Sequence, residues 1–406
     1  MPIGNYCRFI AAALILLNLA IPNACAESPL VLDEGKALEL FEKASKSLKA
    51  ADAQAISARM AENAAVLPAN PNFMFDGDNP GSGSREYTAV FEWTTDISGR
   101  KGFLRKSAAS MRMSTESVVQ AKKIDVLIGF KRVFYDARRV EELARATREM
   151  ASKIKALSNI VRTASRQSEY DRLRLESEFA KAEIAAKSSS EEIALRHCEL
   201  ASLMGLPECG DIELTGEILP SSTTTTGITN INNHPAITKL MSELDRKSFE
   251  QKAAERRAIP GIGFKGGIKN LEGVGTGPYA GIALSLPIFD TGRAEVSLRK
   301  SEINETSALL EAERLRLSVE AATAFKRLEK NSRNADRYRN SVLPQTEKLE
   351  RTAAVHYTEG RIGITELIDA FRTAFQAKLE FLDITYAART AEIDFAYSIG
   401  QWTSIP

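Results

Sequence analysis

The sequence predicts a mainly α-helical protein with a small β part, built from a duplicated unit of a helix, two strands and long helices. Ala, Glu, Lys, Arg and Leu dominate long stretches without proline, and only 7% of the 406 residues are aromatic. This composition is typical of long packed helices rather than a thick globular core. Short alternating segments interrupt the helices at two places about half the chain apart, which indicates an internal repeat.

The N-terminus predicts a signal peptide over residues 1–26. Arg8 precedes an apolar run over 9–21, and Ala24-Cys25-Ala26 fits the small-residue cleavage pattern. A membrane anchor would need roughly 20 apolar residues, so the run is too short for one. Lipidation of Cys25 is the open alternative, although Pro22 and Asn23 suit a lipidation site poorly.

The first structural repeat is predicted over residues 27–210. An Ala-rich helical pattern covers 33–66 and ends at prolines. Strands are expected at about 72–77 and 86–96, followed by a long helix over 101–163, a turn near 163–168 and a helix over 169–204.

A linker over 211–233, with a low-complexity run of Ser and Thr, separates the two repeats. The second repeat is predicted over 234–406, with Pro235 as the first residue of a helix that runs to about 258. The expected elements that follow are strands at about 261–269 and 278–287, a helix of roughly 50 residues from Thr291, a joint at Pro344, a turn over 360–363 and a last helix over 364–399.

The run from Tyr279 to Arg293 joins a strand directly to a long helix. Alternation places one apolar face on each of two neighbouring strands, and that face is expected to contact lipid. Its residues are Ala280, Ile282, Leu284, Ile262 and Phe264. Pro287 ends the strand because it has no N–H to donate, and Asp290 and Thr291 are expected to cap the helix. The same join recurs earlier, so the predicted join residues are Pro287, Asp290, Gly292, Arg293, Gly99 and Arg100.

Four strands per chain cannot close a barrel, since about eight is the practical minimum. An open sheet with an apolar face would leave edges and apolar surface exposed. Three chains that pool their strands would make twelve, which suits an outer-membrane barrel with a water-filled lumen. The strands therefore predict a homotrimer in contact with outer-membrane lipid.

Three segments resemble the outer membrane efflux protein family, the TolC-like channels. They are 286–293 after a strand, Ser98-Gly99-Arg100, and 356–361 leading to 366–370. The resemblance covers nearly all of the mature chain. It implies a homotrimer with a 12-stranded outer-membrane β-barrel and a 12-helix periplasmic α-barrel. It also implies a periplasmic adaptor (membrane fusion) protein and an inner-membrane pump, served by a passive gated conduit without enzyme activity. In its short length, the chain resembles the heavy-metal cation efflux branch of this family.

The same resemblance implies a gate at the periplasmic tip. By motif match, Glu366 and Asp369 face the pore as two rings of carboxylates, Tyr357 helps to latch the tip, and Asp171 belongs to the partner region. Arg361 stands one place before the position where some relatives carry a latching Arg. The alternative for both carboxylates is ordinary favourable charge near the positive end of a helix dipole.

Cys198 and Cys209 remain after cleavage and flank a helix end, so an exported chain permits a disulfide there, with two reduced thiols as the alternative. The letters G-x-G-x-x-G over 261–266 lack a preceding strand and a following helix, which excludes a dinucleotide site. The three histidines are scattered, and no catalytic constellation has a supporting frame. We therefore expect no enzyme, cofactor or metal site, and the near-neutral charge of +1 argues against nucleic acid as a partner.

Two other functions fit parts of the same pattern. A type I protein-secretion exit duct would share the whole fold. A periplasmic coiled-coil adaptor or scaffold would need the alternating segments to be soluble strands. The apolar strand faces argue against the scaffold, because they suit lipid better than water.

Overall fold

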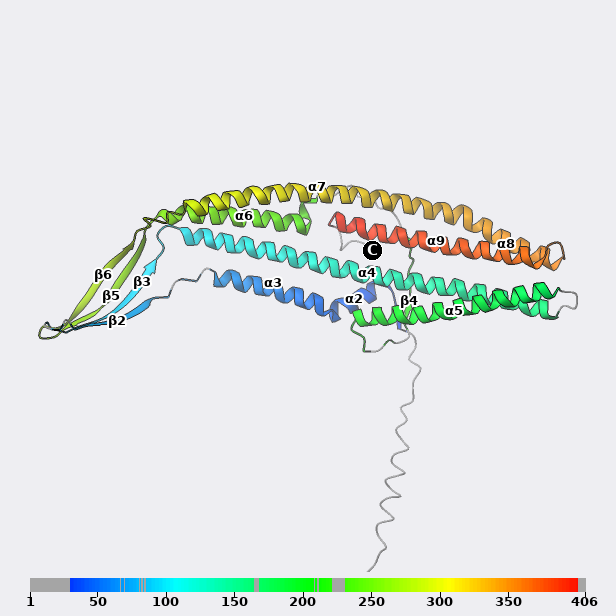
Figure 1. Ribbon diagram of the computed structural model, residues 1–406, viewed down its shortest axis with the longest axis horizontal. Coiled ribbons are helices and arrows are strands. Elements are labelled where there is room, and N and C mark those ends of the chain that lie inside the picture. Colours follow the sequence, from blue (N-terminus) through cyan, green and yellow to red (C-terminus); the bar gives the residue numbers. More distant parts are fainter. Residues whose placement is uncertain are drawn as a thin grey trace, which may run out of the picture.

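The computed structural model describes residues 30–400 apart from 66, 69, 80, 82, 84, 164–167, 208, 210, 211 and 221–230. The predicted signal peptide lies outside the described residues, as do the Ser/Thr run and most of the predicted turn near 163–168. The described chain forms a long rod of helices with a small tilted sheet at one end (Figure 1).

The first half of the chain departs from the prediction at its start. Its elements are β1 (Leu30–Leu32), α2 (Glu34–Ala44), α3 (Lys46–Ala64), β2 (Asn72–Asp78), β3 (Glu86–Thr95), α4 (Arg100–Thr163) and α5 (Glu169–Leu203). The single helix expected over 33–66 is wrong, because the chain leaves helical geometry at Ser45. The Ser45 side chain instead accepts a hydrogen bond from the Leu48 amide and caps α3.

The second half follows the expected order more closely. Its elements are β4 (Ile212–Leu214), a 3₁₀ turn (Ile231–Asn233), α6 (Pro235–Glu255), a 3₁₀ turn (Arg256–Ala258), β5 (Gly261–Leu271), β6 (Gly275–Ser285), α7 (Arg293–Arg337), a π turn (Tyr338–Val342), α8 (Leu343–Thr358) and α9 (Ile364–Ser398). The π turn lies where a joint was expected, and Pro344 falls in the first turn of α8. The helical path is therefore continuous from α7 to α8, and the π turn lies just before the proline, which cannot donate a helical hydrogen bond.

The four-stranded sheet has the order β2-β3-β5-β6, with every neighbouring pair antiparallel. Strands β3 and β5 come from different halves of the chain, so the two hairpins join at the centre of the sheet. Within the described residues, β2 and β6 each pair on one side only.

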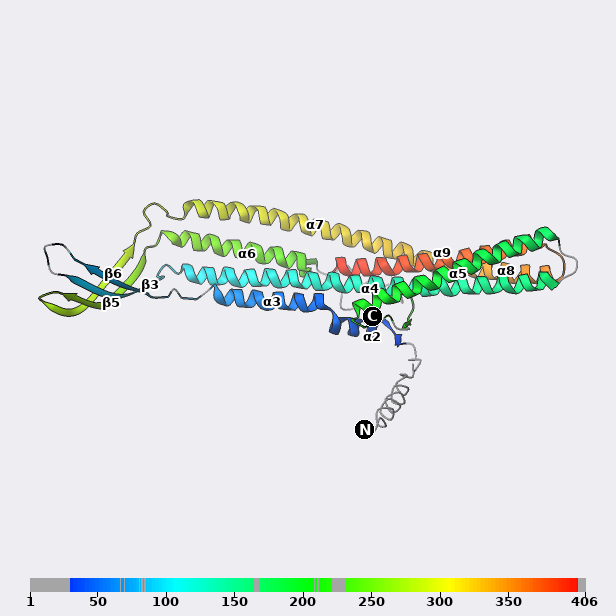
Figure 2. The same ribbon diagram turned by 60° about the horizontal axis from the view of Figure 1, so that its bottom comes forward.

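The helices lie side by side along the rod. Figure 2 shows α7, α6, α4 and α3 as neighbours next to the sheet. Toward the opposite end of the rod, here called the tip, α5, α8 and α9 lie beside the rest of α4. A second, parallel pair of strands, β1 with β4, lies near the middle of the rod, inside a core shared with α2, α4 and α5. Among the described helices, none is both long enough and apolar enough to cross a membrane.

Candidate functional site: a two-faced sheet, its helix joins, the rod centre and the tip

The sheet carries an exposed apolar face. Phe264 on β5 pairs directly with Ile282 on β6, and their side chains are 49% and 70% exposed. Leu284 and Ala280 are also exposed, while Ile262 is half-buried. Strands β2 and β3 extend this face with aromatic residues that the sequence reasoning did not single out. These are Phe73, Phe75, Tyr87, Phe91 and Trp93, all exposed.

The opposite face of the sheet is polar. Lys265 lies 3.4 Å from Glu92, and Lys269 lies 2.5 Å from Glu86, in both cases across the β3–β5 pair. The small residues Gly281 and Ala283 of β6 share this face. The sheet thus separates apolar from charged side chains with the strict period of two that its strands impose.

The two strand–helix joins have the same backbone conformation. Gly99 and Gly292 adopt left-handed conformations with φ of 72° and 77°, and α4 and α7 begin at the next residue, Arg100 and Arg293. At Gly292 a Cβ atom would lie 2.4 Å from the carbonyl oxygen of Ala254, whereas nothing lies within 4 Å at Gly99. At the second join, glycine is therefore required both by the left-handed backbone and by the lack of space for a Cβ atom.

The expected capping of α7 by Asp290 is wrong. Its N-cap is Gly292, which offers no side chain, and Asp290 instead accepts a hydrogen bond from the Gly292 amide and pairs with Arg257 at 2.7 Å. In the first join Asp96 does cap, since it accepts from the amides of Ser98 and Lys101. Burial alone would raise the pKa of Asp96, but a hydrogen bond from the Ser98 hydroxyl, together with these two amides, holds the pKa below its ordinary value. Pro287 follows the end of β6 by two residues.

At the tip of the rod, Glu366 and Asp369 are exposed on one side of α9. Asp369 lies 4.0 Å from Arg174 of α5, which also donates a hydrogen bond to the Tyr170 hydroxyl. Glu366 lies in the first turn of α9, where the helix dipole favours a carboxylate. The geometry is therefore compatible with both interpretations of this pair, as pore-facing carboxylates and as ordinary charges near the positive end of a helix.

The other predicted gate residues have separate surroundings. Tyr357 packs against the apolar cluster that joins α4, α5, α8 and α9 at the tip. Arg361 is exposed and pairs with Glu359 at 3.0 Å within its own turn. Asp171 lies in the first turn of α5. Nearby, Arg372 pairs with Glu178 at 2.5 Å and ties α9 to α5.

A buried arginine, absent from the sequence predictions, organises the middle of the rod. Arg389 of α9 donates hydrogen bonds to the carbonyl groups of Ile218, Glu217 and Leu219 at 2.8, 3.2 and 3.1 Å. Its guanidinium also pairs with Glu392 and lies 4.5 Å from the centre of the Tyr135 ring. Burial raises the pKa of Glu392 despite this pairing. Sequence periodicity could not predict this role. It shows only that the arginine lies on the inner face of a helix, and not that its guanidinium donates hydrogen bonds to backbone carbonyl groups.

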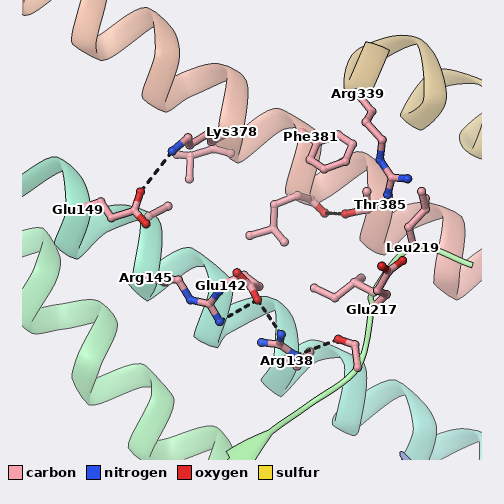
Figure 3. A pocket seen from close by; sticks show the side chains of 15 residues that line it. Arg138, Glu142, Arg145, Glu149, Glu217, Leu219, Arg339, Lys378, Phe381 and Thr385 are labelled. Carbon is pink, nitrogen blue, oxygen red and sulfur yellow. Dashed lines mark hydrogen bonds and ion pairs between the residues drawn. The ribbon is translucent and has the colours of Figure 1, made fainter. Parts of the chain in front are cut away.

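A groove of about 390 Å³ lies beside this network (Figure 3). Residues of α4, α9, the π turn and the segment 216–219 line it. Several of its charges are paired: Lys378 with Glu149 at 3.2 Å, and Arg145 with Glu142 at 3.1 Å. We therefore interpret the groove as a polar seam between the halves of the chain.

Cys198 and Cys209 form a disulfide, with Cα atoms 4.6 Å apart. The bond connects the last turns of α5 to the segment that leads into β4. Because β4 pairs with β1, this disulfide adds a covalent link beside the short parallel strand pair. Elsewhere in the described chain, no group of three or more His, Cys, Asp or Glu side chains is arranged to hold a metal ion.

Comparison with known proteins gives the same fold. No protein-family model matches the chain. The cobalt-zinc-cadmium resistance protein CzcC of Cupriavidus metallidurans is 22% identical over 339 residues, which cover 80% of each chain. The outer-membrane channel OprN has a TM-score of 0.75 at 18% identity, with 91% of this chain and 90% of that chain covered.

Two further solved structures agree. CusC has a TM-score of 0.76 at 16% identity, covering 90% of this chain and 91% of that chain. The open MtrE outer membrane channel of Neisseria gonorrhoeae has a TM-score of 0.75 at 18% identity, covering 90% and 88%. The chain therefore has the protomer fold of these outer-membrane channels, and the predicted fold class and resemblance are confirmed.

Proposed function

We propose that this chain is the outer-membrane channel subunit of a tripartite efflux system. It is a passive gated exit duct with a periplasmic extension, and its function requires no enzyme activity. The observation that carries this proposal is the two-faced sheet: Phe264 and Ile282 are exposed on one face, while Lys265 and Glu92 pair on the other. Such a sheet suits a wall between lipid and a water-filled lumen.

The assembly is a homotrimer in this proposal. In one chain, β2 and β6 leave open edges within the described sheet, and an exposed row of unpaired backbone groups favours pairing with another strand. Three copies joined from β6 to β2 give the twelve strands of a closed barrel. Strands of 10 or 11 residues such as β3, β5 and β6 match the length that a tilted membrane strand needs, about 9–11 residues.

The cargo class proposed is a divalent metal cation. The support is the name of the curated relative, a cobalt-zinc-cadmium resistance protein. Glu366 and Asp369 would form two rings of carboxylates at the tip of the trimer, which favour cations over anions. A periplasmic adaptor protein and an inner-membrane pump deliver the cargo, and outer-membrane lipid surrounds the barrel.

The test is the mass of the protein extracted from the outer-membrane fraction. A trimer that is released only by a mild detergent is the expected result. A monomer or dimer released without detergent would overturn the channel and leave a periplasmic scaffold. A deletion strain then separates cargo classes: we expect greater sensitivity to divalent metals, whereas loss of a secreted polypeptide with normal metal tolerance would indicate a protein-secretion duct.

A further inference from the structure

We propose that a basic band at the helix end of the sheet binds anionic phospholipid headgroups in the adjoining membrane leaflet. The inference rests on the proposed function, because it needs the sheet to be in a bilayer. The basic band comprises residues 96–106, 246–257 and 290–302, which are the start of α4, the end of α6 and the start of α7. It holds twelve Lys and Arg residues against six Asp and Glu, in a chain whose net charge is +1.

The fold creates this concentration of charge, since the three segments are far apart in the sequence. Arg257 at the end of α6 pairs with Asp290 at 2.7 Å, and Arg299 of α7 pairs with Glu250 of α6 at 3.1 Å. The hydroxyl of Ser107, at the edge of the band in α4, lies 3.1 Å from Glu250 as well. The ends of all three helices therefore meet immediately beside the sheet (Figure 1).

The carboxylates of the band are largely neutralised within it. Asp290 and Glu295 both pair with Arg257, and Glu250 and Glu302 both pair with Arg299. Asp96 is occupied by backbone amides at the first join. Together with Arg246, which also pairs with Glu250, three arginines thus engage these four carboxylates inside the layer.

Seven exposed cations of the band have no carboxylate within ion-pair distance among the residues that the structure describes. They are Lys101, Arg105, Lys106, Lys252, Arg256, Arg293 and Lys300. The ammonium groups of Lys106 and Lys252 lie 5.8 and 5.6 Å from the centre of the Phe249 ring. Unpaired cations gathered on one level of a neutral protein indicate an anionic partner.

The position of the band identifies that partner as lipid phosphate. Lys101 to Lys106 lie in the first two turns of α4, so at about 1.5 Å per residue they stay within roughly 10 Å of the helix start, which residues 96–99 connect to β3. That is the depth of headgroups next to a membrane-spanning sheet. Long Lys and Arg side chains keep their apolar stems against the hydrocarbon boundary while their charges reach the phosphate layer. The apolar sheet face and the basic band are thus two levels of one lipid-contacting surface.

The experiment compares lipid retention and lipid-dependent stability of the full-length protein. It is inserted into vesicles of phosphatidylethanolamine alone or with added phosphatidylglycerol. The test variant carries Lys101→Gln, Arg105→Gln, Arg256→Gln and Arg293→Gln. The matched control carries Lys326→Gln, Arg327→Gln, Lys330→Gln and Lys348→Gln, four exposed cations of α7 and α8 without ion pairs in the described chain. Both variants lose the same charge.

We expect wild type and control to retain phosphatidylglycerol through re-extraction and to gain thermal stability from it. The test variant should retain severalfold less and lose most of that gain. Equal retention by test variant and control, or an equal stability gain from inorganic phosphate alone, would overturn the basic band as a lipid site. If the wild type inserts normally without any phosphatidylglycerol preference, only this inference fails. If it inserts in neither vesicle, the proposed function fails as well.

Discussion

Phe264 on β5 lies directly opposite Ile282 on β6, and both side chains are exposed on the same face of the sheet. The next residue pair, Lys265 with Gly281, belongs to the other face, where Lys265 meets Glu92. Because side chains alternate, a slip of one residue would exchange the two faces completely. The pairing register therefore decides which side of the sheet is apolar and which is charged.

Adjacent substitutions on β6 test this arrangement. Ile282→Arg should impair membrane insertion, because a charge on the proposed lipid face would cost about 1–3 kcal/mol per chain at intermediate depth. Ala283→Arg, on the polar face and near Glu92, should insert normally. Outer-membrane abundance of the detergent-extracted trimer measures the difference. Equal insertion of both variants would contradict the assignment of the faces.

The two join glycines give a second prediction. Gly292→Ala should cost more than about 3 kcal/mol, because it adds a clash with the Ala254 carbonyl to the left-handed backbone strain. Gly99→Ala should cost only the strain, about 1–2 kcal/mol, since the space around it is open. Thermal unfolding midpoints of the extracted protein measure both costs. If the two midpoints are equal, contact with Ala254 is not what requires Gly292.

Local sequence signals could predict the sheet and its joins because both depend on neighbouring residues. Alternation over 261–269 and 279–286 predicted the faces of β5 and β6. The helix starts predicted at 101 and at Thr291 lie within two residues of the observed starts, Arg100 and Arg293. The long Pro-free stretches likewise predicted α4 and α7. These are the features whose physical cause is contained within a few turns or strand residues.

The remaining features depend on contacts that are distant in the sequence. Strands β1 and β4 have three residues each, too few for a periodic signal, and they pair across roughly half the chain. Arg389 is recognisable only once the carbonyl groups of 217–219 are placed over α9. The basic band also arises from three separate segments, so no single stretch of sequence predicts it.

A third prediction concerns the folding stability of the protein at low pH. His234, which is only 3% exposed, caps α6 through its Nδ1 atom, which accepts a hydrogen bond from the Ala236 amide at 3.2 Å. Burial lowers the pKa of His234 from its ordinary value of about 6.5. The charge of Arg316 also lowers this pKa, whereas the charges of Glu313 and Asp125 raise it without cancelling the effect of burial. Protonation would turn the acceptor into a donor and destroy the cap.

Since the unfolded chain binds this proton first, stability should fall as pH drops below about 6.5, by at most ~1.4 kcal/mol per pH unit. His234→Asn keeps an acceptor at the cap and does not titrate. Its unfolding free energy should therefore lose this part of the pH dependence while staying near wild type at pH 8. Denaturant titrations across that pH range measure the slope. An identical slope in the variant would show that His234 does not control it.

The tip carboxylates give a fourth prediction. Combining Glu366→Gln with Asp369→Asn should reduce cation preference and weaken block by divalent ions, because the two proposed rings would lose their charge. Glu305→Gln with Glu311→Gln removes the same charge from two exposed positions of α7 far from the tip, so it should leave selectivity near wild type. Reversal potentials of single channels in a salt gradient measure this. Unchanged selectivity in the first variant would support ordinary helix-end charges instead.

The fifth prediction concerns the buried arginine. Arg389→Lys should destabilise the protein by about 3 kcal/mol, because one ammonium group cannot reproduce the planar fork that reaches three carbonyl groups and Glu392. Arg333→Lys, at an exposed pair with Glu329, should change stability by less than about 0.5 kcal/mol. Faster proteolysis at 216–219 should accompany the first change alone, since that segment loses its anchor to α9. If both variants unfold at the same temperature, Arg389 is not the anchor of that segment.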